Sequence, residues 1–169
     1  MGLSPHHILG AVAIGVGASL LMDAWNLLLK RAVGIPSLSY CLLGRWLLHM
    51  PGGTFIHKSI AAAPHRRFEC IIGRTAHYTI GIVLVFAFIA VVPGDWLALP
   101  TLLPALLYGI ATVVFPLFIM QPSFGLGIAG ANTPNPSQTR LKSLMTHTVF
   151  GIGLWGCAAG MRLFWQSPL

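Results

Sequence analysis

At 169 residues the chain has the length of about one domain. Hydrophobic residues make up 56% of it and charged residues only 8%, whereas a soluble domain carries roughly 25% charged residues. So few charges cannot cover a water-exposed surface, which excludes a water-soluble globular protein and predicts that lipid surrounds the chain. The formal charge of +7 comes without a nucleic-acid recognition motif, so we expect no nucleic acid among the partners.

Four apolar stretches are long enough to cross the hydrocarbon core of a bilayer, which needs about 20 helical residues. The expected spans are residues 8–29, 75–92, 100–120 and 144–163. In the third span Pro116 cannot donate a backbone hydrogen bond, which predicts a kink. The predicted fold class is an all-α membrane protein, a four-transmembrane-helix bundle that forms a single domain over residues 1–169.

The cations are concentrated in the segments that follow the first and third spans. Seven of the ten lie between Lys30 and Arg74, Arg140 and Lys142 precede the fourth span, and only Arg162 lies on the opposite side. Because basic loops stay in the cytoplasm, we expect both of these segments there and both termini outside, in the periplasm. The same cations favour anionic headgroups as partners at the cytoplasmic face of the lipid bilayer.

The first cytoplasmic loop, residues 30–74, is too long to be a mere connector. Ser37 is a candidate cap for a helix that runs through about His49 and carries its apolar residues on one side. We expect this helix to lie in the membrane interface under the bundle. The connection between the third and fourth spans, residues 121–140, is rich in Gly, Pro and Asn and predicts an irregular loop.

The cysteine pattern predicts no disulfide. The chain has three cysteines, an odd number, and none of them forms a C-x-x-C motif. Cys157 lies in an apolar run and is most simply a small hydrophobic residue. We therefore expect reduced thiols.

Two short matches indicate an internal duplication. His77 and Gly81 open the second span as His147 and Gly151 open the fourth, with the same spacing. Met22-Asp23 and Met120-Gln121 likewise lie near the cytoplasmic ends of the first and third spans. Our hypothesis is a parallel two-fold repeat about an axis along the membrane normal.

Asp23 is the acidic residue that lies inside a predicted span. A carboxylate there costs about 2.5 kcal/mol or more, so it needs a partner, a proton or a function. His77, Gln121 and His147 occur at matching depth in the other three spans. We therefore expect one polar layer near the inner leaflet, in which Asp23 lies within reach of a histidine; Asn26 continues the same helix face.

This layer and the loop beneath it contain the side chains that divalent metals such as Zn or Fe accept. The candidate metal ligands are Asp23, His49, His57, Glu69, His77 and His147. The candidate catalytic residues are Asp23, His77 and His147, and those for contacting a cofactor or ligand are Gln121 and Asn26. The alternative is structural, because the same side chains could bond to each other and only lock the helices.

Several stretches resemble an uncharacterised family of short bacterial inner-membrane proteins, classed as a domain of unknown function. They are Met22-Asp-Ala-Trp25, Gly34-Ile-Pro-Ser37, Gly44-Arg-Trp46, His77-Tyr78, Met120-Gln-Pro122, Thr133-Pro134 and Ser143-Leu144 through His147. The resemblance covers nearly the whole chain and implies four spans and a bacterial inner membrane. It also supports Asp23, His77, Gln121 and His147 as family positions, but it implies no activity.

Three functions remain open, so the sequence does not decide whether the chain is an enzyme. The first is a metal or acid-base site that acts on a small or lipophilic substrate at the cytoplasmic leaflet. The second is a small proton-linked transporter, working as a homodimer, in which the same residues form a relay. The third is a structural or assembly subunit without chemistry. The polar residues stop at one leaflet in three of the spans, which favours the first function.

Overall fold

The structure is a computed structural model that describes residues 5–35 and 37–166. Within this part the chain is helical and contains no strand. The helices are α1 (Pro5–Val33), α2 (Tyr40–His49), α3 (Glu69–Val91), α4 (Leu102–Ala111), α5 (Gln121–Ser123) and α6 (Pro136–Gln166). Three short segments join them: η1 (Met50–Gly52), the π-helical η2 (Pro116–Met120) and η3 (Ile128–Gly130).

Four helical stretches of the described part are long and apolar enough to cross a membrane: His7–Val33, Glu69–Val91, Leu102–Ser123 and Pro136–Leu163. They confirm the predicted all-α membrane bundle, and large apolar side chains such as Leu9, Val83 and Leu107 lie exposed on their outer faces. The third stretch is irregular as expected, although its regular helix ends at Ala111, before the π-helical turn that begins at Pro116.

The helix ends follow local capping rules. Gly34 follows α1 with a φ of 71°, a left-handed conformation that glycine adopts without strain. Asn135 accepts a bond from the backbone N–H of Gln138 at 3.1 Å, and Pro136 occupies the first turn. Helix α6 therefore begins well before the predicted residue 144, and the irregular connection is shorter than expected.

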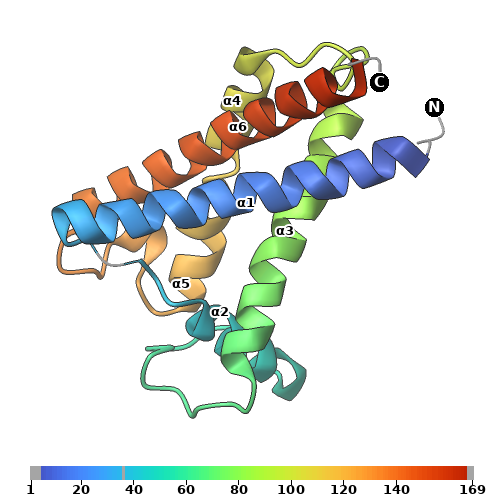
Figure 1. Cartoon of the computed structure of the whole chain (residues 1–169). Helices are drawn as coiled ribbons and strands as arrows, with labels where there is room; N and C mark the ends of the chain where they lie inside the picture. Colours follow the sequence, from blue (N-terminus) through green and yellow to red (C-terminus); the bar gives the residue numbers. More distant parts are fainter. Residues whose placement is uncertain (1–4, 36, 167–169) are drawn as a thin grey trace.

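Helices α1 and α6 run antiparallel side by side, α4 packs on α6, and α3 crosses α1 steeply (Figure 1). The α1–α3 crossing is so close that a side chain at Gly15 would overlap the backbone of Ile82. At Gly151, α6 approaches α4 in the same way. Gly81 and Gly151, the matching positions of the proposed duplication, thus both lie at helix crossings, although the duplication itself stays a hypothesis.

The helix expected in the segment of residues 30–74 is present as α2, and its position in the membrane interface stays a prediction. It begins at Tyr40 rather than near Ser37, because the Ser39 side chain accepts a bond from the Cys41 backbone N–H at 3.2 Å. It lies against the first turns of α3, at the end of the molecule far from the start of α1 and the end of α6 (Figure 1). We call this the basic end, which comprises residues 30–74 and 121–142.

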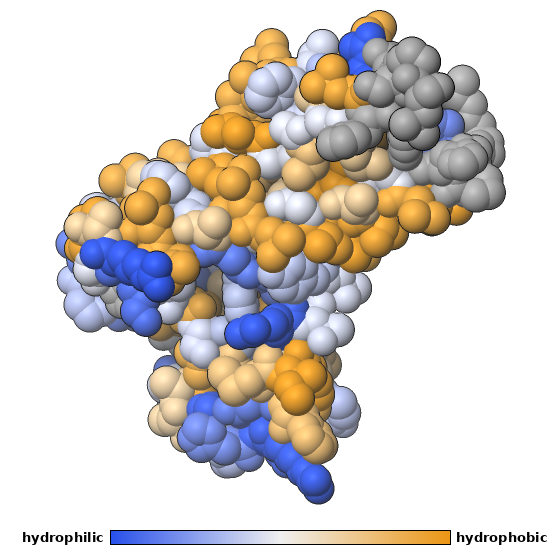
Figure 2. Space-filling view, in the orientation of Figure 1, coloured by the Kyte–Doolittle hydropathy of each residue, from blue (hydrophilic) through white to orange (hydrophobic). Residues whose placement is uncertain are grey.

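Polar and apolar surfaces separate along the molecule. Hydrophobic colour covers most of α1 and the helices around it, whereas hydrophilic colour gathers where α1 ends and around the loop beside α2 (Figure 2). The buried core follows the same division. An apolar cluster that includes Ile14, Phe88, Phe150 and Leu154 fills the part towards the ends of the chain, and the buried ionic groups lie at the basic end.

Candidate functional site

Asp23 is bound by three side chains from two other segments. Its carboxylate accepts hydrogen bonds from the hydroxyl of Tyr40, at the start of α2, and from the hydroxyl of Tyr78 on α3 at 2.8 Å. His77 Nε2, also on α3, lies 3.4 Å from the same carboxylate oxygen that Tyr40 contacts. The predicted proximity of Asp23 to a histidine is therefore confirmed. We call these four residues the Asp23 cluster.

The hydrogen positions within the Asp23 cluster follow from counting donors. The hydroxyl of Tyr40 has a single hydrogen, which it donates to Asp23. His77 Nε2 lies 3.1 Å from the same hydroxyl oxygen, so Nε2 must carry a hydrogen and donate it. Burial, followed by the bond to Asp23, raises the pKa of Tyr40 above its ordinary value, so the phenol keeps its hydrogen. The result is a chain of donors from imidazole to phenol to carboxylate.

The Asp23 cluster is not sealed inside the protein. The side chain of Asp23 is 30% exposed and that of His77 is 16% exposed. A carboxylate offers about four acceptor positions, so the two hydroxyl donors leave room for a further donor. The rings of Tyr40 and His77 stack with centroids 4.4 Å apart, which holds the imidazole beside the carboxylate. The arrangement can therefore deliver a proton to, or take one from, a molecule that reaches Asp23.

The other predicted polar residues bond to different partners. His147 Nδ1 lies 2.8 Å from the hydroxyl of Thr112, which itself donates to the carbonyl of Gly109 at 2.6 Å. His147 is therefore the donor in that pair, and it does not replace His77 beside Asp23. It remains near enough to His77 for the two rings to interact electrostatically.

The two residues predicted to contact a cofactor or ligand both pair with α6. Gln121 Nε2 donates to the Ser143 hydroxyl and the Asn26 side-chain oxygen accepts from the Thr146 hydroxyl, each at 3.4 Å. The side-chain oxygen of Gln121 is buried and has no partner. These contacts connect α5 and α1 to α6, and neither side chain bonds to the Asp23 cluster.

Glu69 is an ion-pair partner rather than a free ligand. Arg45, on α2, binds both of its carboxylate oxygens at 2.8 Å, and only 4% of the Arg45 side chain and 9% of the Glu69 side chain are exposed. The same guanidinium donates to the backbone carbonyls of Ile60, Ala61 and Ala63. The bond to Glu69 raises the pKa of Arg45 above its ordinary value. Through these bonds, Arg45 holds α2, α3 and the loop of residues 53–68 together.

The predicted metal site is not supported. His49 and His57 pack edge to face, 5.2 Å apart, beside an open depression of about 480 Å³, and His49 Nε2 bonds to the carbonyl of Pro64 at 3.1 Å. Glu69 is occupied by Arg45, and Asp23 by its own cluster. Across residues 5–35 and 37–166, no three His, Cys, Asp or Glu side chains gather around a point that could hold a metal ion. Other donors or acceptors hold five of the six candidate ligands. His57 is the exception, because its two ring nitrogens are buried without a hydrogen-bond partner and its ring packs on that of His49.

The expectation of reduced thiols is wrong for two of the three cysteines. Cys41 on α2 and Cys70 on α3 form a disulfide, and Cys157 is free. The pair meets because the two helices touch backbone to backbone: a side chain at Gly44 would overlap the carbonyl of Glu69, and one at Gly73 would overlap that of Tyr40. Spacing in the sequence alone did not reveal this contact.

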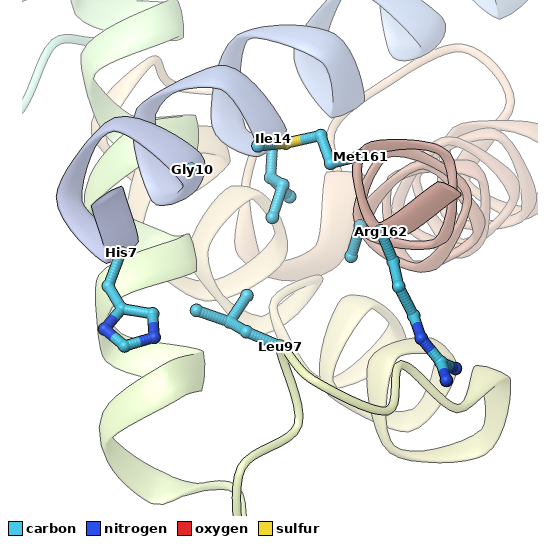
Figure 3. A pocket seen from close by; sticks show the side chains of 7 residues that line it. His7, Gly10, Ile14, Leu97, Met161 and Arg162 are labelled. Atoms are coloured by element: carbon cyan, nitrogen blue, oxygen red, sulfur yellow. The ribbon is translucent and has the colours of Figure 1, made fainter. Parts of the chain in front are cut away.

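A second cavity lies at the opposite end of the bundle (Figure 3). It is lined by His7, Gly10 and Ile14 of α1, Leu97, and Ala158, Met161 and Arg162 of α6. Its volume of about 10 Å³ is room for one water molecule at most. It is therefore too small to hold a substrate.

Sequence reasoning missed Tyr40 and Tyr78, which supply the two hydroxyl bonds to Asp23. A signal for Tyr78 was present, because it follows His77 directly and a carboxylate in a span needs donors. Tyr40 gave no such signal, since it reaches the carboxylate from outside the four spans.

Comparison with curated proteins and with solved structures gives no match. A family model does match, over residues 12–161. This range contains every residue of the Asp23 cluster and both cysteines of the disulfide. The chain therefore belongs to the family described as protein of unknown function (DUF2938).

Proposed function

We propose that the protein is a multi-pass protein of the bacterial inner membrane that performs acid-base chemistry on a small or lipophilic substrate at the cytoplasmic leaflet. The observation that carries the proposal is the donor chain from His77 through Tyr40 to the partly exposed carboxylate of Asp23. Asp23 is the group that exchanges a proton with the substrate. Tyr78 holds its second oxygen at 2.8 Å.

The hydrogen bonds from His77 to Tyr40 and from Tyr40 to Asp23 are both donated in the direction of Asp23, which is the arrangement for proton delivery. Tyr40 passes its hydrogen to the carboxylate while it takes the Nε2 hydrogen of His77, and His77 takes up a proton at Nδ1. Asp23 is then a carboxylic acid that can protonate a substrate, and the reverse steps restore the starting state. A positioned acid or base of this kind typically accelerates a reaction by about 10² to 10⁴.

The exposure of Asp23 favours chemistry over a purely structural lock. A carboxylate that only joins helices is best shielded on all sides, because exposure to lipid leaves its charge unsolvated. Asp23 instead keeps 30% of its side chain exposed. A proton-linked transporter would need polar groups through both leaflets, but beyond Ser19 the buried core of α1 consists of Ala18, Ile14 and Ala11. The acid-base function therefore has the stronger support.

The test compares lipid and small-molecule extracts of cells that overproduce the wild type or a variant at equal membrane levels. We expect at least one compound to change in amount with the wild type and not with Asp23→Asn. The matched control is Asp95→Asn, an exposed acidic position between α3 and α4, which should behave as the wild type. Identical extracts from the wild type and Asp23→Asn would refute the acid-base function.

The proposed orientation places the basic end in the cytoplasm and both termini in the periplasm. It rests on nine cations at the basic end against Arg162 at the other, and exposed Lys58, Arg66 and Arg67 suit anionic headgroups there. Fusions of the C-terminus to alkaline phosphatase and to a fluorescent protein that matures in the cytoplasm test it. Phosphatase activity is expected, and cytoplasmic fluorescence would reverse the orientation.

A further inference from the structure

We propose that Cys41 and Cys70 are a thiol-disulfide exchange site whose redox state controls how firmly Tyr40 is held on Asp23. The consequence for Tyr40 rests on the proposed function of the Asp23 cluster, whereas the exchange itself does not. Cys70 is exposed at the start of α3, where a partner can reach it, and Cys41 is half-buried in the first turn of α2. The chemical class of the partner is a dithiol, in a protein or a small molecule.

The two cysteines remain neighbours whether or not they are bonded. Each lies three residues before a glycine, Gly44 or Gly73, and these glycines bring the helix backbones into direct contact. The Arg45–Glu69 ion pair joins the same two helices beside the cysteines. Because packing and charge hold the helices together, the reduced thiols stay close enough to oxidise again, which a reversible site requires.

The location explains why the bond would be reversible rather than permanent. On the proposed orientation the pair lies at the cytoplasmic boundary of the membrane, where cellular thiols keep most cysteines reduced. Disulfides that form in that compartment are usually transient and serve catalysis or redox sensing. The pair would therefore be a dithiol under ordinary conditions and a disulfide, as in this structure, under oxidising ones.

Reduction follows the usual two-step exchange. A thiolate of the dithiol partner attacks Cys70 Sγ, which forms a mixed disulfide and breaks the bond to Cys41; Cys41 leaves as a thiolate and takes a proton. The second thiol of the partner then attacks its own sulfur in the mixed disulfide and releases Cys70, which also takes a proton. Two electrons move from the partner to the pair, and the partner becomes a disulfide.

The effect on the Asp23 cluster follows from sequence adjacency. Tyr40 directly precedes Cys41, and residues 37–39 before it have no regular structure. The disulfide therefore fixes the first turn of α2, while Arg45 holds the later turns in either redox state. When the disulfide is reduced, the covalent tether beside Tyr40 is lost, and Tyr40 is held by the packing of its carbonyl against Gly73, its bond to Asp23 and its stacking on His77. It then leaves the carboxylate more often.

The first experiment measures exchange on purified full-length Cys157→Ser protein in detergent, a background without the third thiol. The protein is equilibrated in mixtures of reduced and oxidised dithiothreitol, and free thiols are counted by the mass added with a maleimide-polyethylene glycol. We expect two thiols to appear together in one two-electron transition. The absence of a disulfide at every ratio, or two independent one-thiol transitions, would overturn the exchange site.

The second experiment measures the coupling to Asp23 by its rate of modification with dicyclohexylcarbodiimide, read by mass spectrometry. Reduction should raise the rate about tenfold, because a hydrogen bond to a charged group is worth at least roughly that factor. Cys41→Ser/Cys70→Ser should show the fast rate with and without reductant, as should Tyr40→Phe. Equal rates in oxidised and reduced protein would overturn the coupling. Since neither readout needs substrate, failure here is distinct from failure of the acid-base function.

Discussion

Replacing Arg45 by methionine is the substitution with the most predictable effect on stability. The change keeps much of the apolar volume and leaves the Glu69 carboxylate, 9% exposed, without its bidentate partner. It also leaves the carbonyls of Ile60, Ala61 and Ala63 without a donor. Breaking a buried ion pair on one side costs about 3–5 kcal/mol. The pair lies at the edge of the molecule, so we expect the lower limit, about 3 kcal/mol.

The assay is reversible unfolding in mixed micelles, followed by circular dichroism, together with trypsin cleavage after Arg66 and Arg67 in the loop. Arg45→Met should lower the free energy of unfolding and speed cleavage, because the loop loses its anchor. Arg45→Met/Glu69→Leu should recover part of the loss, since it removes the unpaired charge. Arg67→Met, at an exposed position, is the control for the unfolding measurement only, because it removes a trypsin site, and it should change the free energy of unfolding by about 0.5 kcal/mol or less. An equal effect of Arg45→Met and Arg67→Met would refute the anchoring role.

Three further predictions concern helix contacts and the phenol. Gly44→Val should prevent the disulfide and destabilise the protein by about 1–3 kcal/mol, because its Cβ would lie 1.7 Å from a carbonyl of α3. The control Gly156→Ala meets open space inside α6 and should leave the stability unchanged or raise it by up to about 1 kcal/mol. Thr112→Val should cost about 1–3 kcal/mol because a buried imidazole N–H loses its acceptor, while Thr148→Val removes only a bond within its own helix; equal losses would contradict this role. Folding raises the pKa of Tyr40 from its ordinary 10.0, so the stabilisation by its hydroxyl is complete below pH 10 and is lost as the pH rises above it. Above pH 10 the difference in unfolding free energy between the wild type and Tyr40→Phe should shrink by about 1.4 kcal/mol per pH unit, and a difference that grows with pH would contradict the prediction.

The helical spans could be predicted because bilayer thickness imposes a length and a composition on them. The irregular third span followed from Pro116, which cannot donate a backbone hydrogen bond. The meeting of Asp23 and His77 followed from a general cost, since a carboxylate at membrane depth needs a donor. These predictions depend on one residue or one segment at a time, and no knowledge of the loop was required.

The errors at the candidate site concern side chains whose partners come from elsewhere in the chain, whereas the starts of α2 and α6 were misplaced by local capping. Glu69 was assigned to a metal site, although a planar guanidinium fits a carboxylate bidentately and Arg45 lay in the adjacent helix. The disulfide was missed because its determinant is the contact between Gly44 and Gly73 rather than the spacing of cysteines. The positions of Tyr40 and Arg45 depend on how α2 docks, which no periodic pattern specifies.

The Asp23 cluster depends on α2, which lies outside the four spans. Helices α1 and α3 cross at Gly15 and diverge towards the basic end (Figure 1), so Asp23 and His77 face each other where the helices are separating. Tyr40 stacks on the imidazole and bonds to the carboxylate, and it thereby completes the donor chain between them. Substitutions in residues 37–68 should therefore change the reactivity of Asp23 without altering the spans, and that is the property expected of a site that is regulated from the membrane surface.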